Sequence, residues 1–405
     1  MTTQKVLVIG AVWPEPKSSA AGKRMLQLLS LFLDLGCEIT FASTASESPF
    51  SDDLPKIKRI GIALNCDSFD DFIRELKPGM VLFDRFMIEE QFGWRIAKHC
   101  PNALRILDAE DLHCLRRARQ KALKNNKPFT PDGLLTEDDA KREIASILRS
   151  DLTLIISEYE LDLLRTIFKV DASLLHYLPI FADELANLPT FEQRNGFVFI
   201  GNFSHAPNAD AVSYLKKVIW PIIHRLDPTI PLHIYGAYPT QAILQMHNPN
   251  ENFHVLGRAD DALDVIKTSR VMLAPLRFGA GIKGKLLEAM QCGTPSVTTP
   301  MGSEAMNGEL SWNGFISDDP QEIAEAAIEL HQIKSIWEQA QHDGFEILRQ
   351  RFQKNDFGAD FQQRVLQLKQ DLKIHRQNNF VGAMLQFHTM RSTEFLSRWI
   401  SEKNK

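Results

Sequence analysis

The chain alternates between apolar strand-like runs and helix-like segments, and this alternation starts twice along its 405 residues. The first round opens with an apolar run at 5–11, a helical pattern at 23–36 and a second apolar run at 37–44. Continuous apolar runs separated by helices are typical of parallel strands that are buried on both faces. The sequence therefore predicts an α/β fold that begins with a doubly wound sheet.

The first round continues to a polar stretch at 186–196 that contains Pro189 and Gly196. Ser157 and Glu160 fit a capping box at the start of the last helix before this stretch. Because polar segments with proline and glycine often link domains, we expect a domain boundary there. Strands are predicted at 80–86, 103–110 and 152–157, and helices at 89–100 and 136–151.

The second round repeats the pattern, and it predicts a second Rossmann-like domain that faces the first across a cleft. Its predicted strands are 196–202, 231–237, 252–258, 270–276 and 294–300, and its predicted helices are 208–223, 260–269 and 284–293. We expect the first domain at 1–190, the second at 196–340, and a helical tail at 341–405 that packs partly back on the first domain.

The charge balance and the cysteines exclude several classes of protein. The chain has 46 Lys+Arg against 51 Asp+Glu, a net charge of −5, which argues against a protein built mainly to bind nucleic acid. Its five cysteines are scattered without C-x-x-C spacing, so a zinc ribbon is not supported. The first apolar run is short for a signal peptide, and no run approaches the ~18 residues of a membrane span, so we expect neither. We therefore expect a cytoplasmic protein with reduced thiols.

The strongest functional signal is a glycine-rich loop between a predicted strand and a predicted helix, in APLRFGAGIKGKLLEAMQCGTPSV at 274–297. Glycines let the backbone turn tightly and approach a ligand. Free N–H groups and the dipole at a helix start favour an anion, and lysines add positive charge there. The pattern predicts a site for phosphate, most simply a diphosphate. Its glycines and lysines are Gly279, Gly281, Gly284, Lys283 and Lys285.

The spacing in this loop matches neither a Walker A motif nor G-x-G-x-x-G, so ATP hydrolysis and NAD binding are poorly supported. Glu288 follows the loop by about one helical turn. Its carboxylate would repel a phosphate, so it suits hydrogen bonds to ribose hydroxyls. The alternative interpretation is an ordinary glycine-rich turn with solvated lysines and Glu288 on the helix surface.

Three segments together carry a resemblance to a known family. They are 274–297, FIGNFSHAPNADAVSYLKKVIWPII at 199–223 and HVLGRADDALDVIKTSRVMLAPL at 254–276. In their order along the chain they resemble the donor-site domain of the group 1 (family four) retaining glycosyltransferases, which have the GT-B fold. The first domain resembles that family more weakly, in PEPKSSAAGKRMLQLL at 14–29 and LDAEDLHCLRRAR at 107–119.

The resemblance implies metal-independent transfer of a sugar from a nucleotide-diphosphate sugar, which serves as co-substrate, without a further cofactor. It implies that the loop residues Gly279, Ala280, Gly281, Ile282 and Gly284, with Lys283 and Lys285, hold the donor diphosphate. By the same resemblance, Glu288 binds the ribose, Gly257 and Arg258 lie beside the base, and Gly201 and Asn202 face the diphosphate from another turn.

Two positions depart from the family pattern. Many members have a glutamate where this chain has Ala280, and that glutamate usually touches the donor sugar. Many also have an arginine at the place of Asn202, so one phosphate-facing charge is missing and the two lysines must do more. The first departure leaves the identity of the sugar open.

The first domain offers further candidate residues. Asp108, Glu110, Asp111 and His113 follow a predicted strand, and by resemblance His113 points at the donor sugar. An ordinary strand-end turn is an alternative, and so is a divalent-metal site. Gly22 and Arg24 resemble a loop that shapes the acceptor site, with a surface turn as the alternative. Glu304 matches a glutamate in a strand-end loop of the family.

Two segments invite a contact with the inner membrane face. The basic run LRRARQKALKNNK at 115–127 resembles patches through which family members dock on anionic lipid, although a solvated helix face is the alternative. The aromatic residues Phe380, Phe387, Phe395 and Trp399 of the tail suggest the same contact, with core packing as the alternative.

We therefore expect a retaining glycosyltransferase that acts on a glycan, lipid-linked or surface-polysaccharide acceptor, as in polysaccharide biosynthesis. The alternatives are a nucleotide-sugar epimerase or phosphorylase on the same fold, or a non-catalytic subunit that binds a nucleotide sugar. The last alternative is motivated by Ala280.

Overall fold

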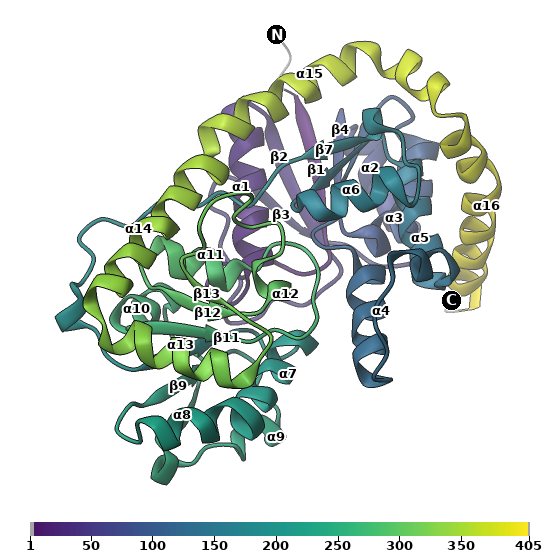
Figure 1. Ribbon diagram of the computed structural model, residues 1–405. Helices are drawn as coiled ribbons and strands as arrows, with labels where there is room; N and C mark the ends of the chain where they lie inside the picture. Colours follow the sequence, from purple (N-terminus) through teal and green to yellow (C-terminus); the bar gives the residue numbers. More distant parts are fainter. Residues whose placement is uncertain (1–3, 404–405) are drawn as a thin grey trace.

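A computed structural model describes residues 4–403 as two parallel sheets with helices on both faces of each sheet (Figure 1). Residues 1–3 and 404–405, at the ends of the predicted first domain and tail, lie outside the described residues. The prediction of two Rossmann-like sheets is confirmed, because both sheets are parallel and each is built from strands that alternate with helices.

The first sheet has seven strands in the order β3-β2-β1-β4-β5-β6-β7. Helices cover both of its faces, so every residue of β4 and β5 is buried, which explains the nearly continuous apolar runs there. The strands are β1 (Lys5–Gly10), β2 (Glu38–Ser43), β3 (Lys58–Gly61), β4 (Met80–Asp84), β5 (Leu104–Asp108), β6 (Leu152–Ile155) and β7 (Leu175–Tyr177). The helices are α1 (Ala20–Asp34), α2 (Ser68–Leu76), α3 (Phe86–His99), α4 (His113–Lys124), α5 (Asp138–Arg149) and α6 (Glu158–Thr166).

The second sheet has six strands in the order β10-β9-β8-β11-β12-β13. Its strands are β8 (Phe197–Ile200), β9 (Leu232–Tyr235), β10 (Phe253–Gly257), β11 (Val271–Ala274), β12 (Ser296–Thr298) and β13 (Gly314–Ile316). The helices of this half are α7 (Ala206–Tyr214), α8 (Trp220–Leu226), α9 (Gln241–Leu244), α10 (Ala262–Thr268), α11 (Gly284–Gln291) and α12 (Pro300–Ser303).

The elements that the pattern missed or misjudged have physical reasons. The edge strands β3 and β13 contain no fully buried residue, so neither leaves an apolar run in the sequence. The helix predicted at 208–223 is two helices, α7 and α8, joined by a π-helical turn at 215–219. Pro221 has no N–H to donate to the preceding turn, and it lies just after the π-helical turn.

Four helices end the chain: α13 (Pro320–Gln332), α14 (Lys334–Arg351), α15 (Lys354–Asn378) and α16 (Phe380–Lys403). The first two pack in the second half, α13 against α8 and α14 against α11. Helix α14 is continuous through residue 340, so the predicted limit between 340 and 341 falls inside a helix, and the chain leaves the second half only after α14.

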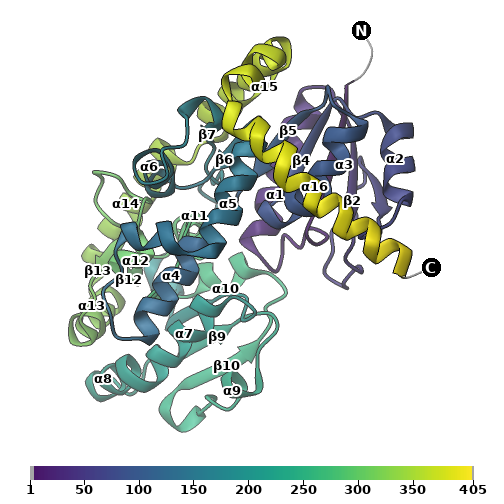
Figure 2. The same cartoon turned by 90° about the vertical axis from the view of Figure 1, so that its right-hand side faces the viewer.

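Helices α15 and α16 cross to the first half. Helix α15 packs against α1 and β5, and α16 lies along α3 and α5 (Figure 2). The aromatic ring of Phe361 meets that of Phe32 edge-on at 5.6 Å between centroids, and Val365 and Leu368 complete the same buried cluster. The packing of α15 therefore extends the core of the first sheet.

Ionic contacts fix the end of α15. Arg376 donates from Nε and Nη2 to the Asp151 carboxylate at 2.7 Å each, and from Nη2 to the Ala103 carbonyl at 2.7 Å. The Asp151 side chain is 2% exposed and also contacts Arg105. These contacts hold the end of α15 against the first sheet.

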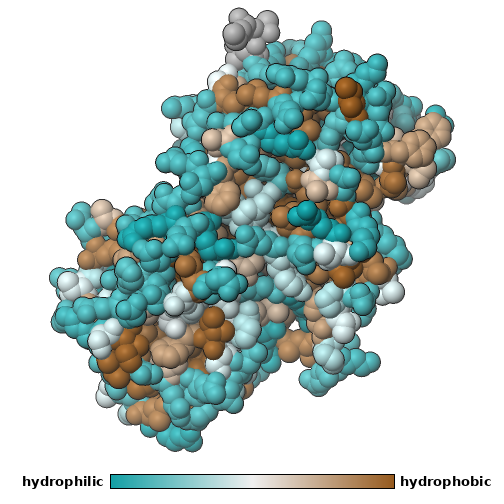
Figure 3. All heavy atoms as spheres, turned by 45° about the horizontal axis from the view of Figure 1, so that its top comes forward, coloured by the Kyte–Doolittle hydropathy of each residue, from teal (hydrophilic) through white to brown (hydrophobic). Residues whose placement is uncertain are grey.

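No helix in the part of the chain that the structure describes combines the length and apolarity needed to cross a bilayer. On the face shown in Figure 3 the surface is mostly hydrophilic, with apolar side chains in small separate groups. Large exposed apolar side chains do occur on α16, among them Phe380, Phe387, Phe395 and Trp399, which are 56–70% exposed, so these four are not core residues.

Replacing Arg376 with alanine should lower the free energy of unfolding by about 2 kcal/mol, because a nearly buried carboxylate loses its charged hydrogen bonds. Denaturant unfolding measures the change. Lys373→Ala, on an exposed part of the same helix, is the matched control and should stay within about 0.5 kcal/mol of the wild type. Equal stability of all three proteins would contradict the structural role given to α15.

Candidate active site

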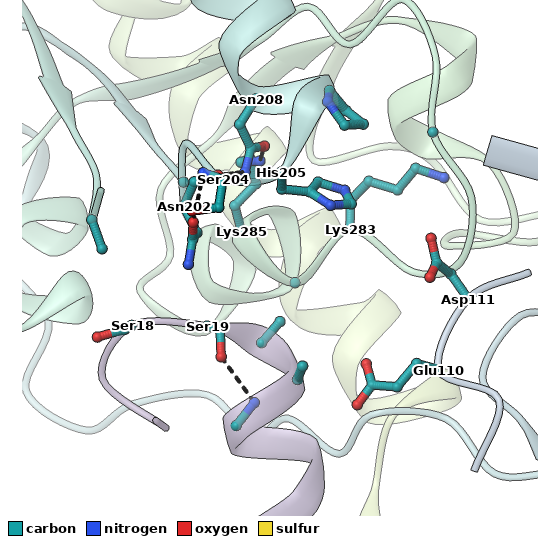
Figure 4. Close-up of a pocket in the computed structure, with 18 of the residues that line it drawn as sticks. Ser18, Ser19, Glu110, Asp111, Asn202, Ser204, His205, Asn208, Lys283 and Lys285 are labelled. Carbon is teal, nitrogen blue, oxygen red and sulfur yellow. Dashed lines mark hydrogen bonds between the residues drawn. The ribbon is translucent and has the colours of Figure 1, made fainter. Parts of the chain in front are cut away.

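A cavity of about 820 Å³ lies between the two sheets, at the carboxyl ends of their strands. Residues that follow β1, β4 and β5 line it from one side, and residues that follow β8, β9 and β11 line it from the other. In open α/β sheets ligands bind outside these strand ends. Figure 4 shows Lys283 and Lys285 on the second-domain side and Glu110 and Asp111 on the first-domain side.

The glycine-rich loop leads into α11, whose start is open toward the cavity. Lys283 is the residue before the helix, and its side chain makes no capping hydrogen bond. The Lys283 carbonyl accepts from the backbone N–H of Leu286 at 2.8 Å, while Gly284 and Lys285 line the cavity. An uncapped helix start presents free N–H groups and the positive end of the helix dipole, which together favour an anion.

Two lysines, the buried Lys283 and the half-buried Lys285, add positive charge at this helix start. The Nζ of Lys283 donates to the Gly281 carbonyl at 2.8 Å and lies 3.9 Å from the Glu304 carboxylate. The Nζ of Lys285 donates to Asn208 Oδ1. Burial lowers the pKa of each lysine to about 8, because the charged form loses its hydration. A bound anion would restore part of that lost stabilisation.

The turn after β8 forms the next wall. Asn202 Oδ1 accepts from the backbone N–H of Ser204 at 2.8 Å, and the Asn202 carbonyl accepts from Asn208 Nδ2 at 2.8 Å. A Cβ on Gly201 would lie 2.7 Å from the Asn208 side chain, so this position requires glycine. Gly201 and Asn202 therefore line the cavity and reach Lys285 through Asn208.

Helix α1 packs beside Glu288, the residue that is predicted to bind the ribose. Glu288 lines the cavity, and its carboxylate pairs with Lys23 of α1. A Cβ on Gly284 would lie 2.4 Å from the Cβ of Ala20, so α11 and α1 touch at their starts. Gly22 also lines the cavity, and a Cβ there would meet the Glu15 backbone at 2.4 Å.

At the far end of the cavity, Arg258 lies over the ring of Phe50, with its guanidinium carbon 4.0 Å from the ring centroid. Tyr238 Oη, from the same half as Arg258, donates to the Glu15 carboxylate at 3.2 Å. Gly257 has φ +74° and its carbonyl accepts from the Gly236 N–H at 2.7 Å, so Gly257 shapes the turn while Arg258 reaches the cavity.

Besides Gly257, the structure does not bring three of the predicted residues to the cavity. Arg24 is fully buried, pairs with Asp108 at 3.3 Å and donates to the Pro179 carbonyl at 2.9 Å, so it braces the first sheet. The Glu304 carboxylate accepts two hydrogen bonds from the Arg119 guanidinium, at 2.6 and 2.9 Å, so it pairs with Arg119 instead of lining the cavity.

The third is Gly281, whose N–H donates to Glu160 Oε1 at 2.9 Å instead of facing a ligand. Glu160 does not form the predicted capping box, because Ser157 makes no side-chain capping bond. The same Oε1 accepts from the Leu112 N–H at 2.8 Å, and burial raises the pKa of Glu160 to about 8. Glu160 thus joins the first half to the glycine-rich loop. The other loop residues, Gly279, Ala280 and Ile282, do line the cavity.

His113 lines the cavity at the start of α4. Its Nε2 lies 3.5 Å from Asp111 Oδ1, and burial lowers the pKa of His113 to about 4, so the imidazole is neutral at pH 7. Arg116 contacts Asp111 at 3.2 Å and His205, across the cavity, at 3.4 Å. Among the described residues, no three His, Cys, Asp or Glu side chains form a group that could hold a metal ion.

Sequence reasoning missed several lining residues. They are Glu15, Asp84, Arg85, Arg116 and His205. His205 and Arg116 lie in the segments 199–223 and 107–119, which carry the family resemblance. A search of these two segments for polar residues that face the cavity from opposite sides could have found them. The backbone of Arg85, with φ +72°, leaves no trace in the sequence.

Comparison with solved structures establishes the fold. Sucrose-phosphate synthase from Thermosynechococcus elongatus is 15% identical with a TM-score of 0.68, over 90% of this chain and 99% of that one. TarM from S. aureus is 9% identical with a TM-score of 0.69, over 90% and 99%. Anabaena Alr3699/HepE is 11% identical with a TM-score of 0.64, over 90% and 100%. The chain therefore has the GT-B fold of glycosyltransferases, as the sequence predicted.

The sequence comparison narrows the class. Residues 194–332, which contain the glycine-rich loop and both lysines, match the model of the family described as "Glycosyl transferases group 1". No curated protein sequence matches the chain. The family and the fold together support glycosyl transfer in general.

Two glycines of the loop give a matched pair of variants. Gly281→Ala should destabilise the protein by at least about 1 kcal/mol, because left-handed backbone disfavours a Cβ. Gly281 has φ +63°, and a Cβ there would lie 2.9 Å from the Asp111 Cβ. At Gly279 the nearest atom would be 3.7 Å away, so Gly279→Ala should unfold like the wild type. Thermal and denaturant unfolding check this order, and a reversed order would refute the described loop.

Proposed function

We propose that this protein is a retaining glycosyltransferase that moves a sugar from a nucleotide-diphosphate donor to a glycan, lipid-linked or surface-polysaccharide acceptor. The observation that carries the proposal is a pair of lysines, the buried Lys283 and the half-buried Lys285, at the uncapped start of α11 inside the cleft. The family identified at 194–332 supports the reaction type.

The proposed role of the two lysines is to stabilise the leaving group. When the bond between the sugar and the diphosphate breaks, the nucleoside diphosphate gains negative charge. Fixed amide and ammonium donors stabilise that charge most in the transition state, because they need no reorganisation. The acceptor hydroxyl forms the new bond on the face of the sugar that the diphosphate leaves and passes its proton to an oxygen of the departing diphosphate, so the anomeric configuration is kept.

The donor roles follow the position of each residue around the cavity. The carboxylate of Glu288 would accept hydrogen bonds from the ribose, with Lys23 holding it in place. Arg258 would lie beside the base, and Gly201 and Asn202 would face the diphosphate. Neutral His113 would meet the sugar, because a neutral imidazole can both donate and accept hydrogen bonds.

A uridine nucleotide is the first donor to test. The structure of Anabaena Alr3699/HepE contains UDP and glucose, and a structure of S. aureus TarM contains UDP. A thermal-shift screen with UDP, GDP, ADP and their sugars would identify the base, since binding to the native state raises the melting temperature. An EDTA arm tests the proposal that transfer needs no metal ion.

The proposed contact with a membrane surface is supported by two exposed segments. Helix α4 carries three exposed basic residues of the run 115–127, namely Arg117, Lys121 and Lys124, and α16 carries exposed aromatic residues. Both lie on the face shown in Figure 2. Co-sedimentation with anionic and neutral vesicles would test this contact separately from transfer.

Lys285→Ala should abolish transfer and weaken UDP binding by about tenfold or more, because one charged phosphate contact is lost. The fold should remain, since the variant removes a desolvated charge. Lys267→Ala is the matched control: Lys267 lies on α10 outside the cavity and pairs with Asp264 at 2.6 Å. Calorimetry with UDP measures binding, and wild-type turnover by Lys285→Ala would end the proposal. Donor binding without transfer or hydrolysis in the wild type would favour the non-catalytic alternative.

UDP affinity should fall as the pH rises above about 8. The lysines have pKa values of about 8 in the free protein, and UDP binds their charged forms. Above that pH each must take up a proton, so affinity drops by up to about tenfold per pH unit for each lysine. The terminal phosphate of UDP is already ionised, because its second pKa is about 6. Calorimetry from pH 6.5 to 9.5 tests this, and a flat profile would contradict it.

A further inference from the structure

Arg85 has a backbone conformation that glycine adopts freely and other residues avoid. Its φ is 72° and its ψ is 158°. The conformation is held from outside, because the Arg85 N–H donates to the Asp108 carbonyl of the neighbouring strand at 2.9 Å. Such strain persists where the surrounding structure imposes it, and it gathers at functional sites. A glycine here would fold with less strain. The side chain of Arg85 must therefore have a role that offsets the backbone strain.

The guanidinium of Arg85 faces the cavity with free hydrogen-bond donors. The side chain is 23% exposed, and its contact with protein is Asp84, whose Oδ1 lies 3.6 Å from Nε. Within residues 4–403 the guanidinium makes no hydrogen bond. The negative charge of Asp84 raises the pKa of Arg85, so it stays charged. Its outer edge can therefore meet a planar pair of ligand oxygens.

Glu110 follows the end of the adjacent strand, β5. Like Arg85, it combines a positive φ with a side-chain atom that has no hydrogen-bond partner. Its φ is 59°, and its side chain points from its loop into the cavity (Figure 4). The Oε1 atom is buried without a hydrogen-bond partner in the described structure. Burial raises the pKa of Glu110 to about 8, so at pH 7 most of the carboxyl is protonated. A protonated carboxyl donates a hydrogen bond and does not repel an anion.

The start of α3 adds to the preference for negative charge. The helix begins directly after Arg85, and no side chain caps it. The positive end of a 14-residue helix therefore lies next to the backbone of Arg85. Glu110 lies on the first-domain side of the cavity, across from Lys283 and Lys285 (Figure 4). Arg85, which directly follows β4 of the first sheet, lines the same cavity.

We propose that Arg85 and Glu110 form a subsite that binds an oxyanion of the acceptor, either a carboxylate or a phosphate. The inference rests on the proposed glycosyl transfer and specifies the chemical class of the acceptor. Arg85 binds two oxygens of the group, Glu110 donates one hydrogen bond, and the acceptor is held with its hydroxyl toward the donor sugar. Both residues are specificity-determining.

The test uses the full chain and three sugar probes. Calorimetry, with and without UDP, measures binding of methyl glucuronide, glucose 6-phosphate and methyl glucoside. We expect at least one of the two anionic probes to bind about tenfold or more tightly than the neutral one, and the better anion tells carboxylate from phosphate. Equal binding of all three, or no binding of either anion, would overturn the subsite. Because the sugar probes are also measured without UDP, failure of UDP to bind would affect only the proposed donor site.

Three variants assign the binding to these side chains. Arg85→Ala and Arg85→Gly should both lose the anionic probe while keeping UDP affinity. Arg85→Gly should also melt at a higher temperature than Arg85→Ala, because only the glycine relieves the backbone. Arg74→Ala, an exposed residue on α2 that pairs with Asp71, is the control and should bind like the wild type. Retained anion binding in either Arg85 variant would overturn the proposal.

The third variant, Glu110→Gln, tests whether Glu110 acts as a protonated hydrogen-bond donor or as an ionised carboxylate. Glu110→Gln keeps a hydrogen-bond donor, so it should bind the anionic probe within a few-fold of wild type at pH 7. Above pH 8 the wild-type carboxyl ionises and should bind the probe more weakly than Glu110→Gln does. Identical pH profiles of the two proteins would contradict the role given to Glu110.

Discussion

Two ammonium groups at the start of α11, those of the buried Lys283 and the half-buried Lys285, set the conditions for the rest of the structure. Lys283 lies 3.9 Å from Glu304, but Arg119 already occupies that carboxylate with two hydrogen bonds. Lys285 has only the neutral side chain of Asn208 as its hydrogen-bond partner among the described residues. Buried charges with so little compensation are costly, and the open helix start adds more positive potential. The cavity is therefore suited to a ligand that brings its own negative charge, which a diphosphate does.

The glycine-rich loop depends on both halves of the chain. Arg119 of α4 donates to the Gly279 carbonyl at 2.9 Å, and Glu160 of α6 accepts from the Gly281 N–H. Lys23 of α1 pairs with Glu288, and Ala20 packs against Gly284. The first domain thus supplies the contacts that position a loop belonging to the second. A substitution in α1, α4 or α6 can therefore disturb the donor site without touching a ligand.

The sequence predicts what is local and misses what depends on tertiary contacts. The loop at 277–288 could be identified because its glycines and lysines are neighbours in the chain and lie between a buried strand and a helix. Arg24 was assigned to the acceptor site, yet it is buried in an ion pair with Asp108, and no local pattern distinguishes these two environments. Glu160 fitted a capping box, but a partner more than a hundred residues away, Gly281, takes its carboxylate. Backbone strain at Arg85 is equally invisible, because the neighbouring strand imposes it.

The protonation of Lys283 and Lys285 is the most direct measure of the central claim. NMR titration of selectively labelled lysines, with each signal assigned from a single substitution, would follow both ammonium groups in the free protein and with UDP. The account predicts a pKa near 8 for each lysine in the free protein and a clear rise when the diphosphate binds. Two ordinary lysine pKa values that do not move on addition of UDP would contradict it.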